Sequence, residues 1–171
     1  RSDVPISLHF SGGVDSTALL IKIKEVAGWD YPLGIFNLTY EGFEGLDYKY
    51  AKEICDRLNL NLQKVTLSPN EVPNLAKELQ YFQDEPYGGI PSISMYKLNQ
   101  IERDLGYVVS LEGQGGDEVF GGYLSHLHLA IKDMQESEFE NNEIVNKLLH
   151  LINKPKLEVI KSAEKFIESG F

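Results

Sequence analysis

The sequence predicts an α/β fold: an open parallel sheet with helices on both faces, followed by a helical C-terminal segment. Three observations carry this prediction. Strand-like apolar runs alternate with stretches of helical pattern up to residue 111, which is the order of βαβ units and of a parallel sheet. Glycine-rich loops directly follow the first and the fourth of these runs. The 171 residues, of which 42% are hydrophobic and 25% charged, are enough for one globular domain with a core.

Apolar runs place the four predicted strands. Residues 5–10 form a run that stops abruptly at Ser-Gly-Gly, and residues 31–40 are rich in Leu, Ile and Phe. Residues 61–67 supply the third strand, and residues 107–111, with the sequence YVVSL, supply the fourth. Helices fill the intervals, and the last of them carries a proline in its first turn, where helices tolerate it. We expect these helices over residues 16–26, 47–58, 71–80 and 91–105.

Beyond Tyr123 the character of the sequence changes. A helix is predicted over residues 124–134, followed by the acidic, polar stretch QESEFENNE. Two amphipathic helices are predicted over residues 142–153 and 156–169. We therefore expect a domain over residues 1–134 and a helical extension of it over 135–171. Because the chain starts with Arg rather than Met, we also expect it to be a piece of a longer protein.

Charge and composition exclude several classes of partner. A formal net charge of −10 argues against a nucleic-acid face or an anionic membrane surface. It leaves room for a phosphate ligand held by backbone amides and Mg²⁺. The single cysteine, Cys55, is expected at a buried helix position. No apolar run approaches the ~18 residues of a membrane span, and no signal peptide appears. We expect a cytoplasmic protein with neither nucleic-acid nor membrane partners.

The stretch FSGGVDS follows the first predicted strand. Ligands bind beyond the carboxyl ends of strands in an open parallel sheet. Gly12 and Gly13 permit close backbone approach, and the N–H groups of the following helix N-terminus can hold an anion. Hydroxyls of Ser11 and Ser16 can add donors, and Asp15 fits if Mg²⁺ bridges it to phosphate oxygens. The alternative is a glycine-rich turn with an Asp or Ser helix cap.

A second glycine-rich loop, SLEGQGGDEVFGGY, follows the fourth predicted strand at residues 110–123. Its five glycines, its acidic residues and its Gln leave the end of the sheet together. We expect a metal- and phosphate-facing loop in which Asp117 meets Asp15 and shares Mg²⁺ with it. A long flexible loop is the alternative.

These loops resemble known enzymes. FSGGVDS resembles the SGGxDS signature, or PP-loop, of the ATP pyrophosphatase superfamily, which has an adenine nucleotide alpha hydrolase-like fold. The combination resembles the synthetase domain of the asparagine synthetase family. Three segments carry this resemblance in matching order and spacing: SDVPISLHFSGGVDST (2–17), DEPYGGIPSISMY (84–96) and EGQGGDEVFGGY (112–123).

The resemblance implies a carbon–nitrogen ligase that depends on ATP and Mg²⁺ and takes part in asparagine biosynthesis. It adenylates a carboxylate, with aspartate as the first candidate, and releases pyrophosphate. Ammonia then displaces AMP to form the amide. The ammonia comes from solution or from a glutaminase domain in the same chain or in a partner. Residues 1–134 correspond to the ATP-pyrophosphatase synthetase domain.

The resemblance also assigns roles to residues. Asp15 and Asp117 bind Mg²⁺ and, with Gln114, form the candidate catalytic set. At the end of the second predicted strand, the register leaves Leu38 and Tyr40 as alternative adenosine contacts. The full set for ATP and pyrophosphate is His9, Ser11, Gly12, Gly13, Asp15, Ser16, Leu38, Tyr40, Glu112 and Gly113. Candidates for lining the acceptor pocket are Asp84, Glu85 and Tyr87.

One departure from the family pattern concerns Gln114. Most asparagine synthetases carry Glu at this place, and Gln can hydrogen-bond but cannot take a proton. The acceptor therefore stays open between aspartate and another carboxylate, as in a related PP-loop amidotransferase or a β-lactam-type synthetase. The alternative that is not an enzyme is a fragment that binds a nucleotide without catalysing a reaction.

Overall fold

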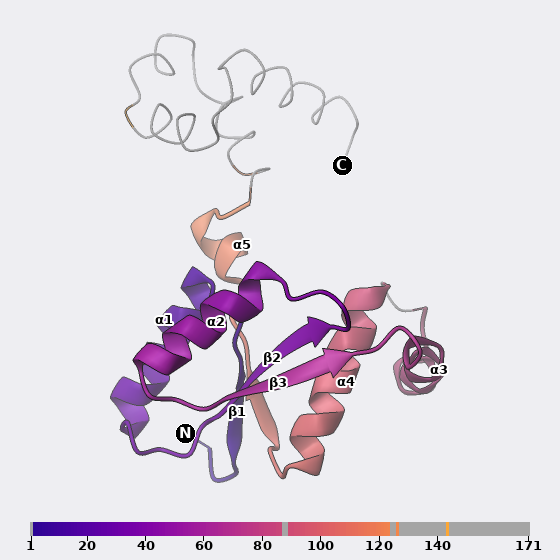
Figure 1. The fold of residues 1–171 in the computed structure, drawn as a ribbon, viewed down its shortest axis with the longest axis horizontal. Coiled ribbons are helices and arrows are strands. Elements are labelled where there is room, and N and C mark those ends of the chain that lie inside the picture. Colours follow the sequence, from indigo (N-terminus) through magenta and orange to yellow (C-terminus); the bar gives the residue numbers. More distant parts are fainter. Residues whose placement is uncertain (1, 87–88, 124–125, 127–142, 144–171) are drawn as a thin grey trace. The chain divides into compact units, whose positions relative to one another are not determined.

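A computed structural model describes residues 2–86, 89–123, 126 and 143. It divides the chain into two units, Arg1–Gln114 and Gly115–Phe171, each of which is described by itself (Figure 1). The expected division at residue 134 and the helices expected over 124–134, 142–153 and 156–169 lie outside the described residues. In the part of the chain that the structure describes, no helix combines the length and the apolar character needed to cross a membrane.

The first unit contains the predicted parallel sheet. Its strands are β1 (Ile6–His9), β2 (Gly34–Tyr40), β3 (Leu62–Leu67) and β4 (Val109–Leu111). All neighbouring strands are parallel, in the order β3-β2-β1-β4. The chain thus builds the sheet from β1 toward β3 and then returns to place β4 on the opposite side of β1. The predicted α/β fold is confirmed.

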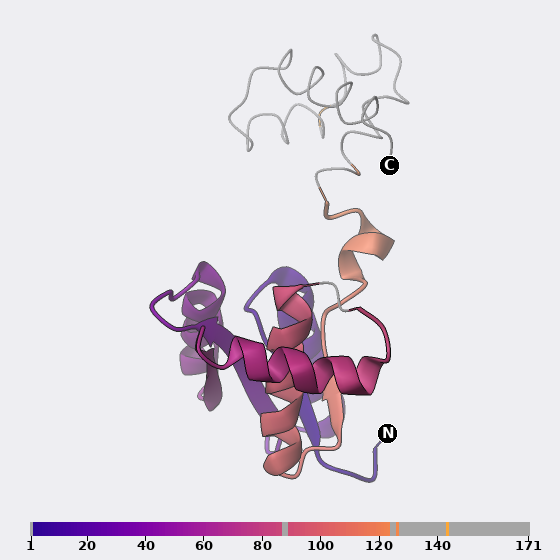
Figure 2. The ribbon, with the colours of Figure 1, turned by 90° about the vertical axis from the view of Figure 1, so that its right-hand side faces the viewer.

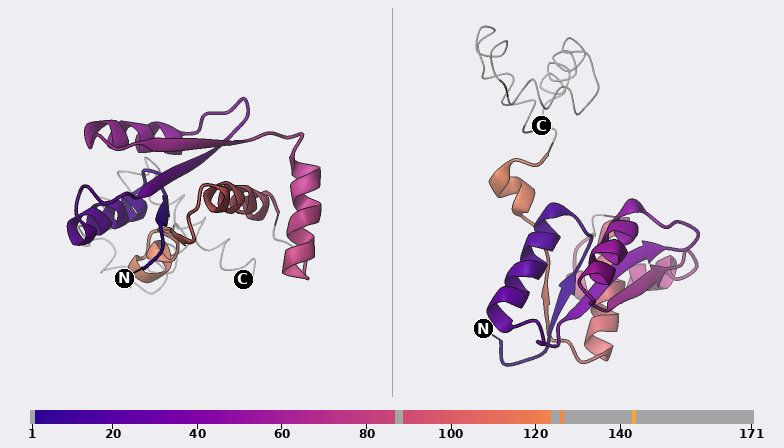
Figure 3. Two further views of the ribbon diagram at one scale, coloured as in Figure 1. Left: turned by 90° about the horizontal axis from the view of Figure 1, so that it is seen from below. Right: turned by 60° about the vertical axis from the view of Figure 1, so that its left-hand side comes forward.

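Helices cover both faces of this sheet. They are α1 (Val14–Ala27), α2 (Leu46–Arg57), α3 (Val72–Gln83) and α4 (Ile90–Asp104). Figure 3 (left) shows α1 and α2 on the side of the sheet opposite to α4, and α3 and α4 face the viewer in Figure 2. The helix α1 begins two residues earlier than predicted, because the Thr17 N–H donates to the Gly13 carbonyl at 2.9 Å and closes a first turn inside the glycine motif. Asp15 and Ser16 therefore belong to the first turn of α1.

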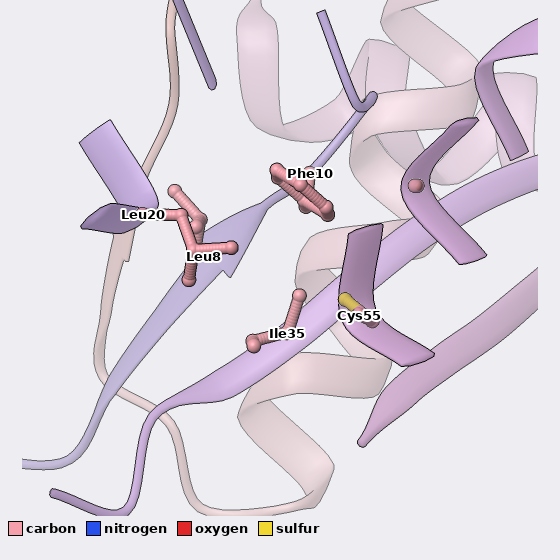
Figure 4. Packing of buried hydrophobic residues seen from close by; sticks show 6 residues of the cluster. Leu8, Phe10, Leu20, Ile35 and Cys55 are labelled. Carbon is pink, nitrogen blue, oxygen red and sulfur yellow. The ribbon is translucent and has the colours of Figure 1, made fainter. Parts of the chain in front are cut away.

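Among the described residues, an apolar cluster on each face of the sheet holds these layers together. Strand alternation directs Leu8 and Phe10 of β1 and the loop after it, together with Ile35, toward α1 and α2, where they pack with Leu20 and Cys55 (Figure 4). Cys55 is buried, as predicted. On the other face of the sheet, β2, β3 and α4 form a smaller core from Phe36, Val65 and Leu98.

The described part of the second unit contains α5 (Gly116–Phe120). Here the prediction of a continuous loop over residues 110–123 was wrong in part, because a short helix interrupts it. The helix is bounded by Gly115 and Gly121, both in the left-handed region with φ of 90° and 81°. A five-residue helix flanked by glycines lacks the apolar period by which helices are recognised in a sequence.

Candidate nucleotide site

The strand order creates a switch point at the end of β1. β1 pairs with β2 on one side and β4 on the other, so the connections that leave β1 and β4 diverge. Open α/β sheets bind ligands at such points, beyond the carboxyl ends of the strands. The first glycine loop follows β1, and the second begins directly after β4. Both loops therefore start at the place where this sheet topology favours a ligand.

Hydrogen bonds within the first loop fix its shape. The Gly13 N–H donates to Ser11 Oγ at 3.2 Å, and the Ser16 hydroxyl donates to the Gly13 carbonyl at 3.2 Å. The two hydroxyl oxygens of Ser11 and Ser16 lie 3.1 Å apart. Gly13 is the N-cap of α1 and makes no side-chain cap. The alternative of an Asp or Ser helix cap is thus not what the structure shows.

Close backbone contacts explain two of the glycines. Gly12 has φ of +76°, and a Cβ there would lie 2.5 Å from the backbone nitrogen of Ala51 in α2. A Cβ on Gly113 would lie 3.0 Å from the backbone nitrogen of Ser16 and 3.1 Å from Cβ of Asp15. The start of the second loop therefore lies directly against the first turn of α1, so the two loops meet within the first unit.

A cavity of about 340 Å³ opens where the loops meet. This lies within the ~300–1,000 Å³ usual for small-molecule sites. Among the predicted residues, those that line it are His9, Ser11, Gly13, Asp15, Ser16, Leu38, Glu112, Gly113 and Gln114. The structure thus brings together residues from the ends of three strands that are far apart in the sequence.

Other predicted residues lie away from this cavity. Gly12 packs on α2. Of the two alternatives on β2, Leu38 lines the cavity, whereas Tyr40 does not and places its hydroxyl 3.2 Å from Ser94 Oγ. Asp84 ends α3 in the left-handed conformation, and the Glu85 carbonyl accepts a hydrogen bond from Gln80. Neither acid lines the cavity, and Tyr87 lies outside the described residues.

Several lining residues were not predicted from the sequence. They are Phe10, Phe36, Asn37, Asp47, Met95 and Leu98. Asn37 donates through Nδ2 to the Phe10 carbonyl at 2.7 Å, while its Oδ1 is buried without a partner among the described residues. Asp47 lies in the first turn of α2. A polar Asn inside the largely apolar run of residues 31–40 was the available sequence signal for this side of the site.

Acidic side chains surround His9 at the floor of the cavity. His9 Nε2 lies 2.9 Å from Glu102 Oε2, and Nδ1 lies 3.6 Å from Glu112 Oε2. Glu102 is on α4 and only 3% exposed, whereas the Glu112 side chain is 47% exposed. Glu102 was not predicted from the sequence.

The second unit positions Asp117 by backbone contacts. The N–H groups of Gly121 and Gly122 both donate to the Asp117 carbonyl, at 2.8 Å and 3.2 Å. A Cβ on Gly122 would lie 1.6 Å from Asp117 Oδ1, so only glycine leaves that carboxylate its present place. The Tyr123 hydroxyl donates to Glu118 at 2.7 Å and lowers the pKa of that carboxyl.

The donor chemistry of the described residues fits magnesium only in part. Asp15 offers carboxylate oxygens, the ligands that Mg²⁺ prefers. No cluster of three or more His, Cys, Asp or Glu side chains suited to a metal occurs within residues 2–86 and 89–123. An ion here would need phosphate oxygens and water as further ligands. Because Asp15 and Asp117 belong to different units, their sharing of one ion stays a prediction.

Comparison with known proteins identifies the family. The asparagine synthase family model matches residues 1–166. The chain is 32% identical over 128 residues to a putative asparagine synthetase (glutamine-hydrolyzing) 2 of Methanocaldococcus jannaschii, covering 75% of this chain and 24% of that protein. It is 35% identical over 126 residues to asparagine synthetase 1 of Bacillus subtilis, covering 72% and 19% respectively.

A third relative matches a larger share of this chain. Asparagine synthetase B of Escherichia coli is 30% identical over 166 residues, covering 88% of this chain and 28% of that protein. The chain thus spans about a quarter of the length of the curated relatives it matches. The family match extends well beyond the three segments in which the resemblance was first visible. With the fold and the two glycine loops, these matches show that the chain belongs to the asparagine synthase family.

Proposed function

We propose that this chain is the ATP-pyrophosphatase domain of an amide synthetase, a carbon–nitrogen ligase that forms AMP. It adenylates a carboxylate, with aspartate as the first candidate, and the adenylate then reacts with ammonia. The proposal rests on family membership and on one structural observation. The cavity at the switch point is lined by both glycine loops and by the N-terminal turn of α1.

The cavity suits a nucleotide in a definite orientation. The backbone N–H groups at the start of the 14-residue helix α1 carry partial positive charge and favour the phosphates. Strand ends suit the nucleoside, since Leu38 of β2 and the apolar residues Phe36, Met95 and Leu98 line the cavity toward α4. We therefore place the phosphates at Ser11–Ser16 and the adenosine toward the sheet and α4.

Magnesium would be held by Asp15 and the phosphate oxygens, with Asp117 as the second protein ligand. The ion would neutralise phosphate charge that the described part of the chain leaves uncompensated, because no Lys or Arg of that part lines the cavity. A carboxylate beside polyphosphate would otherwise be repulsive. Asp15 is on the first turn of α1, so the helix N-terminus and the ion would act on the same phosphates.

The chemistry has two steps. A carboxylate oxygen of the acceptor attacks the α-phosphorus of ATP, the bond from that phosphorus to the bridging oxygen breaks, and pyrophosphate leaves with the electron pair. The nitrogen of ammonia then attacks the acyl carbon, the bond from that carbon to the AMP oxygen breaks, and AMP leaves. The nitrogen must also lose a proton. Gln114 lines the cavity but cannot accept a proton, so a phosphate oxygen or water takes it.

Gln114 is the observation that favours a second candidate, a related PP-loop synthetase with a different acceptor. Asp84 and Glu85, proposed for the acceptor pocket, do not line the nucleotide cavity. The acceptor is therefore the least constrained part of the proposal. Ammonia would come from solution or from a glutaminase domain in the same or a partner chain.

Isotope transfer tests the proposal directly. The chain is incubated with ATP, Mg²⁺, ammonia and aspartate labelled with ¹⁸O in its side-chain carboxylate. We expect pyrophosphate and AMP in equal amounts, with one ¹⁸O in the AMP. Asp15→Asn should abolish this transfer, while Asp3→Asn, a change at an exposed position outside the cavity, should not.

Three other outcomes separate the alternatives. Transfer of label from another carboxylate, with none from aspartate, would favour the second candidate. ATP binding without AMP formation would favour a nucleotide-binding fragment. Release of inorganic phosphate and ADP without AMP would refute every ATP-pyrophosphatase assignment.

A further inference from the structure

A buried carboxylate on α4 holds a histidine at the floor of the cavity. Glu102 is only 3% exposed, and one of its oxygens lies 2.9 Å from His9 Nε2. The His9 side chain is itself only 12% exposed. A buried acid is costly, and an apolar pair of similar volume would pack here at no greater cost. The pair is therefore a candidate for chemistry that the steps proposed above do not use.

The contact with Glu102 selects one tautomer of His9. Strand alternation turns Leu8 and Phe10 toward α1 and α2, so His9 faces α4. An ionised carboxylate only accepts hydrogen bonds, so the Nε2–H of His9 donates to Glu102. Neutral imidazole has a single N–H, and Nδ1 therefore keeps its lone pair. A carboxylate that orients a histidine in this way leaves the other nitrogen ready to accept a proton, as in catalytic triads.

The free nitrogen of His9 has no donor among the described residues. His9 Nδ1 is buried without a hydrogen-bond partner, and Glu112 Oε2 lies 3.6 Å away. Both atoms are acceptors, so they cannot bond to each other, and both side chains belong to residues that line the cavity. No Lys or Arg in the described part of the chain lines the cavity and could donate to them. A small cation with several N–H groups would satisfy both acceptors at once.

The proposed amide synthesis needs such a cation and a base for it. Ammonia dissolved at neutral pH is mostly ammonium, which has no lone pair and cannot attack an acyl carbon. A base must take one proton before the attack, in addition to the proton that the nitrogen loses afterwards. Gln114 cannot accept a proton, and carboxylates are weaker bases than neutral imidazole. His9 is thus the strongest side-chain base among the described residues that line the cavity.

We propose that ammonium from solution binds between His9 Nδ1 and Glu112, and that His9 is the base that converts it to ammonia. One N–H bond of ammonium breaks, its electron pair stays on the nitrogen, and the proton bonds to Nδ1. The imidazolium then lies between two carboxylates that stabilise its charge, and it returns the proton to water beside the half-exposed Glu112. Glu102 is a positioning residue, since it acts through His9.

This inference rests on the proposed function, which creates the need for ammonia. It concerns side chains, so the backbone at the ends of β1 and β4 stays available to the nucleotide. Ammonia delivered by a glutaminase domain would not need this base, and the inference therefore applies to ammonium taken up from solution.

A comparison of two nitrogen nucleophiles tests the inference. Hydroxylamine is mostly neutral at neutral pH, so it needs no base before it attacks. The chain is supplied with ATP, Mg²⁺, the carboxylate that the isotope experiment identifies, and either ammonium chloride or hydroxylamine, and the amide and the hydroxamate are quantified. His9→Gln keeps an N–H for Glu102 but removes the base, so the ratio of amide to hydroxamate should fall roughly 100-fold. Asp104→Asn, at an exposed acid of α4, should leave the ratio unchanged.

Variants of the two acids separate their roles. Glu112→Gln removes the attraction for a cation, so it should raise the KM for ammonium about tenfold more than the KM for hydroxylamine. Glu102→Leu should lower kcat with ammonium, whereas Glu102→Gln, which keeps an acceptor for Nε2–H, should restore much of it. ¹⁵N NMR of the imidazole, assigned by its loss in His9→Gln, should show the Nε2–H tautomer in the unaltered chain and a mixture of tautomers in Glu102→Leu.

The outcomes distinguish this inference from the proposed function. A ratio that survives His9→Gln would overturn the inference alone, and so would AMP formation without any amide from ammonium. Equal losses with both nucleophiles would also overturn it, because His9 would then serve another step or the fold. An unchanged tautomer and kcat in Glu102→Leu would remove the role of Glu102. If the unaltered chain forms no AMP with any carboxylate, the proposed function and this inference fail together.

Discussion

Gly12 lies against the backbone of Ala51 so closely that a Cβ on residue 12 would be 2.5 Å from the Ala51 nitrogen. This contact joins the first glycine loop to α2, whose first turn supplies Asp47 to the cavity. The packing of Gly12 on α2 therefore positions the first glycine loop, although α2 itself does not contact the phosphates in the proposed orientation of the nucleotide. The glycine at this place serves packing as much as ligand approach.

Gly12→Ala should destabilise the chain by ~3 kcal/mol, because it combines left-handed backbone strain with a clash against helix backbone. Gly42→Ala is the matched control. Gly42 has nearly the same φ, +77°, but open space around it, so only the strain of ~1 kcal/mol applies. Guanidinium unfolding of both variants measures the difference. Equal losses would mean that the contact with Ala51 carries no energy.

Gly122→Ala should impair turnover through Asp117. The new Cβ would occupy the present place of Asp117 Oδ1 and displace the carboxylate. We expect AMP formation to fall on the order of 100-fold, as for a misplaced catalytic group, with a change in stability below ~1 kcal/mol. Gly121→Asn controls for the turn, since Asn tolerates the left-handed φ of 81° there. Unchanged turnover in Gly122→Ala would contradict a role for Asp117 in this position.

Lys24→Met should cost ~2–3 kcal/mol of unfolding free energy. Lys24 is 3% exposed, and its Nζ donates to the carbonyls of Trp29 and Tyr31 at 3.0 Å and 2.8 Å. Methionine would fill the space but leave both carbonyls without this donor. Lys22→Met, at a side chain that is 72% exposed on the same helix, should change stability by less than ~0.5 kcal/mol. Urea unfolding compares the two variants, and similar losses of unfolding free energy would disprove that the two hydrogen bonds of Lys24 stabilise the chain.

Cys55 should resist thiol reagents in the folded chain. Burial raises the pKa of its thiol from 9.0 to about 11, so the reactive thiolate is scarce at neutral pH. Reaction with Ellman's reagent should therefore follow global unfolding. Because the folded pKa is the higher one, the thiol's contribution to stability is present below pH 9 and is lost as the pH rises toward 11. Rapid labelling at neutral pH without denaturant would contradict this.

Acid should weaken the link between α4 and Glu71, the N-cap residue of α3. The Lys97 ammonium, 2.5 Å from Glu71, and the Ser68 N–H, 2.8 Å away, lower the pKa of the Glu71 carboxyl below 4.5. The folded pKa is the depressed one, so this stability is present above pH 4.5 and is lost as the pH falls through the lower folded value. Lys97→Met should flatten the pH dependence of stability in that window. Lys77→Met, at an exposed lysine of α3, should leave it as it is.

The strand and helix order was predictable because apolar periodicity changes sharply along the first unit. The part of the site after β1 was predictable because two glycines, two serines and Asp15 directly follow an apolar strand, which is an unusual combination at a strand end. Glu102 was not predicted because acidic residues on helices are usually exposed. Ser94, Leu98 and Glu102 are all buried at intervals of four, so an acid on that face was the signal. Asp47 gave no such signal, since acids are common in first turns.

The late position of the short strand β4 in the sequence affects how the protein folds during its synthesis. Ser7 of β1 bonds to Val109 of β4 across 102 positions of sequence, so the cavity wall at this edge cannot form until β4 has left the ribosome. At ~5–20 residues per second, the nascent β1 waits roughly 5–20 s with that edge unpaired. Ribosome-arrested chains should therefore bind nucleotide only when they are long enough for β4 to have left the ribosome. Nucleotide binding would then indicate that the sheet is complete.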